Sequence, residues 1–272
     1  MTELKRYYSK FIFIYIGFVT ISFISGLIVG EDSLGGALHD YKFHEKYFFK
    51  FADEFKITIL EYGNYNEVRN SPVFYIIVSM LIKFGFNIIH LKYLNFLIII
   101  ALLLFFFKSL KIKYENISIN SQIIFLCTIL LSPTVRSLTY HPYPFLWAIC
   151  FFVISIYFFL NFEKFKNKND KLKNALYCIL HLSISSYLTP NFAIFILFYG
   201  LKFFLKFKFS KKILIILFFS FFLSLPALSF LIWKDFYLFH NEVYEISNLE
   251  KFNIANKIII ISSIIFLFFL PF

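Results

Sequence analysis

The stretch from Gly30 to Phe51, GEDSLGGALHDYKFHEKYFFKF, places carboxylates, histidines and aromatic residues directly after a long apolar run. Two of its acids, Asp32 and Asp40, lie close to glycines and to the end of that run. A carboxylate whose pKa is raised by desolvation can take a proton from a hydroxyl group. We therefore single out Asp32 and Asp40 as candidate general bases. The following nearby acids are interpreted as solvated loop residues: Glu45, Asp53, Glu54 and Glu61.

The spacing that starts at Asp40 predicts an amphipathic helix. His44, Phe48, Phe51 and Phe55 recur at helical intervals, and lysines occupy another face. Such a helix is expected to lie on a membrane surface with its aromatic face turned inward. Asp40 and His44 are then one turn apart, which makes His44 a candidate substrate-binding residue.

These polar residues are positioned by a chain that is mostly apolar. Of 272 residues, 60% are hydrophobic and 16% charged, and apolar runs long enough to cross a bilayer recur along its length. The sequence therefore predicts an all-α, polytopic helical membrane protein that forms a single membrane domain over residues 1–272. The three cysteines lie inside apolar segments without metal-ligand spacing, so neither a disulfide nor a zinc site is predicted.

About eight transmembrane helices are expected. The candidate spans cover residues 11–30, 90–107, 121–138, 143–161, 174–189, 191–207, 212–232 and 254–272.

A further apolar segment, from Pro72 to Ile89, is assigned from the charges of the loops. Hydropathy alone would allow it to span, even though the central Lys83 costs about +2.5 to +3.5 kcal/mol on the insertion scale. If it lies on the outer interface instead, the inner loops hold most of the lysines, as the positive-inside rule requires. We therefore expect residues 31–89 to be an outer loop with surface helices and the N-terminus to be cytoplasmic.

The same charge distribution explains the net charge of +11. Lysines gathered in loops 1–10, 108–120, 162–173 and 202–212 serve orientation and contact with anionic lipid, so no nucleic-acid partner is expected. Besides residues 31–89, a short outer loop is expected over residues 133–142, which is the second along the chain, and a large one over 233–253. We expect the membrane to be a bacterial inner or plasma membrane.

The order of these features resembles a known family. A first span leads into an outer loop with an acid near its start and surface helices, followed by a proline in RNSP, by LNFLIIIALLLFFF and by ILLSPTVRSLTYHPYPFLWAICFFVISIYFFLNF. This arrangement, over about residues 11–200, resembles the GT-C superfamily of integral membrane glycosyltransferases. It is most similar to the branch of protein O-mannosyltransferases and lipid A aminoarabinose transferases.

The resemblance implies transfer, with inversion, of a sugar from a polyprenyl-phosphate-linked donor to an acceptor on the outer side of the membrane. It assigns the catalytic acid to Asp40, with Asp32 as the rival, and contact with the lipid phosphate to the stretch from Arg69 to Ser71. Many members carry an acid in the second outer loop, where this chain has Tyr140 and His141. A two-acid mechanism or a metal is therefore in doubt; no cofactor is predicted, and dependence on a divalent metal is left open.

Departure of a phosphate requires a cation near the outer interface. Arg69 and Arg136 are the only arginines besides Arg6 in a lysine-rich chain, and the guanidinium fork suits phosphate. Both are candidate substrate-binding residues, although each also suits an interfacial headgroup anchor. His141, in YHPYP, would face the same side of the membrane as these arginines and is also a candidate substrate-binding residue, although histidine is equally a residue type found in turns.

Three other functions remain open on the sequence alone. They are a transporter or flippase of lipid-linked glycans, a polysaccharide polymerase, and a noncatalytic membrane subunit. The expected partners are the lipid bilayer, a polyprenyl-linked sugar donor and a glycan, lipid or protein acceptor. Relatives often continue through more spans or a soluble domain, so the resemblance implies a minimal or truncated member.

Overall fold

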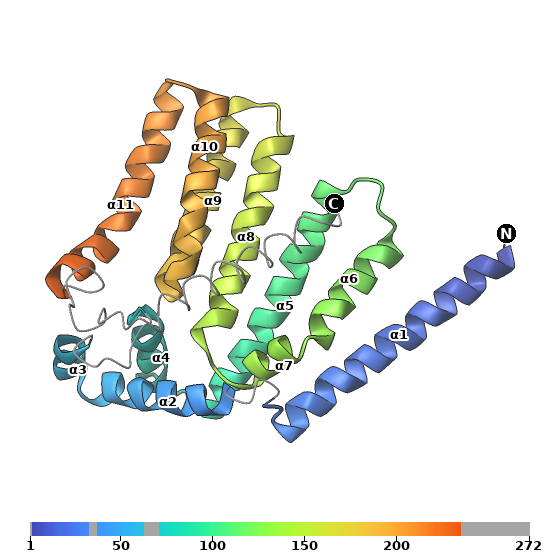
Figure 1. Cartoon of the computed structure of the whole chain (residues 1–272), viewed down its shortest axis with the longest axis horizontal. Helices are drawn as coiled ribbons and strands as arrows, with labels where there is room; N and C mark the ends of the chain where they lie inside the picture. Colours follow the sequence, from blue (N-terminus) through green and yellow to red (C-terminus); the bar gives the residue numbers. More distant parts are fainter. Residues whose placement is uncertain (1, 33–36, 63–70, 235–272) are drawn as a thin grey trace, which may run out of the picture. The chain divides into compact units, whose positions relative to one another are not determined.

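The computed structural model describes residues 2–32, 37–62 and 71–234, and these residues are almost entirely helical, with no strand among them. The chain divides into two compact units, residues 1–227 and 228–272. The site described below belongs to the first unit. The helices are α1 (Thr2–Val29), α2 (Ala37–Asp53), α3 (Phe55–Glu61), α4 (Val73–Lys83), α5 (Ile88–Lys113), α6 (Ile119–Leu131), α7 (Pro133–Tyr140), α8 (Pro144–Lys164), α9 (Lys168–Leu188), the 3-10 helix η1 (Pro190–Ile194), α10 (Phe195–Phe207) and α11 (Lys211–Lys234) (Figure 1).

Several of these helices are long and apolar enough to cross a membrane, as a multi-pass membrane protein requires. Within the described residues there are five, or up to six if one bent pair of helices counts as a single span. The expected number of about eight is therefore not reached in this part of the chain, and the span expected at 254–272 lies outside it. The five are Phe11–Val29, Ile88–Lys113, Pro144–Lys164, Pro190–Phe207 and Lys211–Phe230.

The span expected at 174–189 forms a helix, α9, that is long enough to cross a membrane with its 21 residues but is not apolar enough to count as a candidate span. Its first turns carry lysines and asparagines, and serines follow along its second half. α9 instead packs along α8, where the Ser185 hydroxyl donates to the carbonyl of Ala148 over 2.7 Å. Polar side chains that bond between helices lower the apparent hydropathy of a packed helix.

The span expected at 121–138 is broken into α6 and α7, whose axes meet at 63°. The break lies at Ser132 and Pro133. Proline removes a backbone donor and forces the residue before it out of the helical region, and Ser132 accordingly has a ψ of 120°. The expected span is therefore bent and counts as one span only if the two helices are taken together, and the bend gives α7 its own direction.

The segment between α1 and α5 contains three helices. α4 has 11 residues, about 16 Å at the usual helical rise, and so falls well short of a hydrocarbon core of about 30 Å. α2 packs against α4 through fully buried aromatic rings, Phe48 and Phe51 from α2 with Phe74 and Tyr75 from α4. The aromatic face predicted for α2 is thus covered by protein, and Phe55 starts α3 and is exposed.

Three connections that have lysines in them or in the adjoining helix turns, α5–α6, α8–α9 and α10–α11, lie at one end of the first unit, which we call the basic end (Figure 1). Lys164 pairs with Glu115 at 2.7 Å, and the Lys212 ammonium donates to Asn169 Oδ1 over 2.8 Å. The buried Lys171 ammonium donates to the last carbonyls of α8, at Phe162 and Glu163. These bonds hold the three connections together.

Candidate functional site

The end of α1 determines where the first acids of the loop lie. Gly30 has a φ of +67°, and the Glu31 amide donates to the Gly26 carbonyl over 2.9 Å, which is the Schellman pattern of a helix C-terminus. The chain therefore folds back over the last turn of α1. A Cβ atom at position 26 would lie 2.5 Å from Glu31 Oε2, so glycine leaves the space that the carboxylate occupies.

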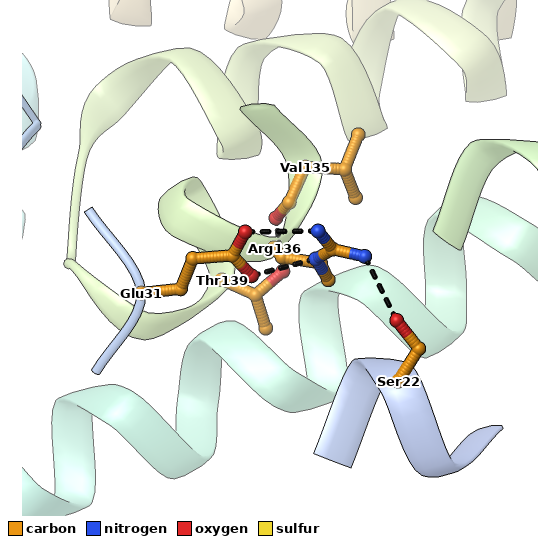
Figure 2. A network of polar contacts seen from close by, with 5 residues as sticks. All are labelled: Ser22, Glu31, Val135, Arg136 and Thr139. Carbon is orange, nitrogen blue, oxygen red and sulfur yellow. Dashed lines mark hydrogen bonds and ion pairs between the residues drawn. The ribbon is translucent and has the colours of Figure 1, made fainter. Parts of the chain in front are cut away.

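Glu31 forms a two-pronged ion pair with Arg136 of α7 (Figure 2). Arg136 Nε donates to Glu31 Oε2 over 2.6 Å and Nη2 donates to Oε1 over 2.8 Å, while Nη1 donates to the Ser22 hydroxyl over 3.1 Å. The two side chains are 14% and 21% exposed for Arg136 and Glu31. The guanidinium expected to bind a phosphate is therefore engaged within the protein, and we call this pair the Glu31–Arg136 clasp.

Asp32 follows directly and remains exposed. One of its carboxylate oxygens, Oδ1, accepts a hydrogen bond of 3.1 Å from the Leu38 amide in the first turn of α2. A carboxylate at that position satisfies an amide that has no partner within the helix and favours the positive end of the helix dipole. Asp32 is thereby held between the end of α1 and the start of α2.

His141 ends α7 and is 4% exposed. Pro142 follows it, and the backbone of His141 is extended, as expected for a residue before proline. Neither ring nitrogen has a hydrogen-bond partner in the described part of the chain. Its ring lies against those of Tyr41 and Tyr140, with centroids 5.3 and 4.9 Å away.

The charges around His141 come from α5 and from the loop after α1. Burial lowers the pKa of His141, the positive charge of Lys92 lowers it further, and the negative charge of Asp32 opposes both. The imidazole is therefore neutral at pH 7, with one donor and one acceptor nitrogen. Lys92 Nζ lies 3.7 Å from the centre of the Tyr140 ring, a cation–π contact.

The remaining site residues named from the sequence lie elsewhere. Asp40 is exposed in the first turn of α2. His44 is buried against α4, where its Nδ1 is hydrogen-bonded to the Tyr75 hydroxyl, and burial lowers its pKa to about 4. That environment suits a neutral packing residue that joins α2 to α4. Arg69 lies outside the described residues.

Of the residues named from the sequence, the structure brings together Asp32, Arg136 and His141, and it adds Glu31 and Lys92. Glu31 was not singled out from the sequence, although Gly26 and Gly30 just before it were an available signal. Lys92 is a basic residue near the start of an otherwise apolar predicted span. Their contacts depend on α1, α5 and α7 meeting, which no local pattern reveals.

No site for a metal ion is found among the described residues. The described residues contain no group of three or more histidines, cysteines and acids placed to hold a metal ion. What the arrangement does offer is a carboxylate open to solvent, a half-buried ammonium and a neutral imidazole within one small region.

Comparison with protein-family models, with curated proteins and with solved structures gives no match.

Proposed function

We propose that the protein is a membrane glycosyltransferase that moves a sugar from a polyprenyl-phosphate-linked donor to an acceptor hydroxyl at the outer face of the membrane. The observation that supports this function best is the grouping of Asp32, Lys92 and His141 around the end of α1, away from the basic end. Base, cation and hydrogen-bonding group are the three components that such a displacement requires.

The reaction is a single displacement. The acceptor oxygen attacks the anomeric carbon, the bond between that carbon and the phosphate oxygen breaks, and its electron pair leaves with the phosphate. The acceptor proton passes to the Asp32 carboxylate. Because attack and departure take place on opposite sides of the anomeric carbon, the product has the inverted configuration.

Each neighbouring group has a role in this scheme. The Lys92 ammonium stabilises the negative charge that grows on the departing phosphate. The neutral His141 ring is buried against Tyr41 and Tyr140 and has no internal partner in the described structure, so it hydrogen-bonds the donor only after the donor displaces one of these rings. Arg69, from the stretch that the family resemblance assigns to the phosphate, is a second candidate cation.

The orientation of the chain follows from its lysines. With the basic end in the cytoplasm, as the positive-inside rule favours, the loop that carries α2, α3 and α4 lies at the outer face. A lipid-linked donor held in the outer leaflet then meets Asp32 and Lys92 where α1 and α5 reach the interface.

The test compares two matched variants, Asp32→Asn and Asp40→Asn, for transfer of radiolabelled sugar from the native polyprenyl-phosphate pool in membranes. With equal expression and insertion, loss of a general base lowers the rate of Asp32→Asn by about 100-fold or more, whereas Asp40→Asn keeps the wild-type rate. The opposite pattern would make Asp40 the base. A wild-type protein that transfers nothing would contradict the proposed function and favour a noncatalytic or transport role.

A further inference from the structure

The end of α1 is fixed to the rest of the first unit by polar bonds. α1 packs against α6 and α7, and many of its apolar side chains remain exposed, as suits a helix that faces lipid. In lipid, apolar contacts between helices have no hydrophobic driving force, so van der Waals packing and interhelical hydrogen bonds determine where a helix end lies. The Glu31–Arg136 clasp and its bond to Ser22 supply a fixed geometry (Figure 2).

An ion pair with this geometry is more than is needed if the contact only holds helices together. Removing two charges from water costs several kcal/mol per ion, and apolar residues of similar volume often stabilise a fold at least as well. Here the chain keeps the charges, closes α1 with a left-handed Gly30 and leaves Gly26 without a side chain so that the carboxylate fits. The arrangement therefore specifies where Glu31 lies, beyond any gain in stability.

Asp32 is the next residue, and its position is fixed as a result. Its backbone is fixed on one side by the clasp, and its carboxylate is fixed on the other by the Leu38 amide of α2. Arg136 and His141 belong to α7 and to the residue that follows it, so the clasp also sets how far the Asp32 carboxylate lies from the His141 ring.

We infer that Glu31 and Arg136 are positioning residues that hold Asp32 beside His141 and Lys92. The inference rests on the proposed function, because the role of Asp32 as base belongs to it. The clasp keeps the base in reach of the acceptor hydroxyl, and Arg136 does not itself bind the phosphate of the donor. Displacement of a catalytic group by about 1 Å can cost a factor of about 100 in rate.

The test uses the variants Glu31→Gln, Arg136→Gln and the charge reversal Glu31→Arg with Arg136→Glu in the full-length protein. Each single variant lowers kcat by about 10- to 100-fold with an unchanged KM for the native lipid-linked donor, and the reversal restores much of kcat. Glu115→Gln is the control, since it removes the exposed pair with Lys164 at the basic end and leaves kcat unchanged.

A second readout does not depend on transfer. In a protein that carries His141→Cys, the new thiol occupies a buried position, and the native Cys127, Cys150 and Cys178 are also buried. A membrane-impermeant maleimide labels residue 141 slowly while the clasp is intact and faster once Glu31→Gln is added, because the end of α1 then opens.

The outcomes separate the two proposals. A raised donor KM for Arg136→Gln, with no effect of Glu31→Gln, would make Arg136 a phosphate ligand and overturn the inference. Unchanged labelling of residue 141 in the Glu31→Gln background would overturn it as well. If the wild-type protein shows no transfer at all, the proposed function fails, and the labelling result alone decides whether the clasp holds the end of α1.

Discussion

At the residue scale, the position of Asp32 depends on how a helix end and an ion pair fit together. The left-handed Gly30 turns the chain, the Glu31 amide closes on the Gly26 carbonyl, and the carboxylate then meets Arg136. A Cβ atom at position 26 would lie 2.5 Å from Glu31 Oε2, so a side chain there would force the carboxylate away from its present position. The catalytic proposal for Asp32 follows from this local geometry rather than from the acidity of the loop as a whole.

Gly26→Ala tests that geometry with Gly17→Ala as its control on the same helix. A Cβ atom at position 17 meets nothing within 4 Å. We expect Gly26→Ala to destabilise the protein by about 1–3 kcal/mol through overpacking. Gly17→Ala should be neutral or stabilising by up to about 1 kcal/mol, since alanine is the better helix former. Thermal unfolding in detergent measures both, and equal behaviour of the two variants would argue against the close approach at Gly26.

At the scale of elements, the decisive features are the bend between α6 and α7 and the pairing of α2 with α4. The bend turns α7 so that Arg136 meets α1 while His141 meets α2. The pairing covers the aromatic face of α2 with α4 and leaves Asp40 exposed on its first turn.

The pairing of α2 with α4 predicts opposite outcomes for two adjacent phenylalanines. Phe48 is 0% exposed between α2 and α4, whereas Phe49 is 43% exposed. Phe48→Ala should cost about 3–5 kcal/mol of stability by loss of buried area and creation of a cavity. Phe49→Ala should stay within about 0.5 kcal/mol of the wild type, as a surface substitution does. Limited proteolysis of the 37–83 segment measures the difference. Equal protection in both variants would show that α4 does not cover this face.

Part of this arrangement could be predicted from the sequence, because it depends on residue spacing and charge within short segments. The helical spacing from Asp40 predicts α2, and the charges of the loops predict that residues 72–89 do not span. α4 has 11 residues, fewer than a membrane span needs, and its place at the outer surface stays a prediction. The bend at Pro133 was missed, although a serine followed by proline is a known break. Glu31 and Arg136 are 105 residues apart, so their contact could not be foreseen from spacing alone.

At the scale of the whole molecule, the distribution of charge separates two ends of the first unit. Lysines and few acids occupy the connections of the basic end, where Lys164 and Lys212 bond across neighbouring connections. The cluster of Asp32, Lys92 and His141 lies where α1, α5 and α7 meet the loop that carries α2. From the positive-inside rule we expect the cluster to face the outer side of the membrane.

The orientation is tested by labelling single cysteines in intact cells. Lys46→Cys on α2 and Lys166→Cys in the α8–α9 connection both replace exposed side chains. We expect an impermeant maleimide to label residue 46 in intact cells and residue 166 only after the membrane is permeabilised. Cells that express the unsubstituted protein provide the background from the buried native cysteines. Labelling of residue 166 from outside would invert the topology and place the candidate site in the cytoplasm.

The central claim, that this chain transfers a sugar, is tested most directly with the purified wild-type protein in lipid vesicles that contain the radiolabelled native pool of polyprenyl-linked sugars. Membrane extract from cells lacking the protein supplies the acceptors. The account predicts that labelled acceptor and free polyprenyl phosphate accumulate in equal amounts, and that neither accumulates when Asp32→Asn replaces the wild type. Absence of both products with the wild-type protein, in vesicles where it is correctly inserted, would contradict the account.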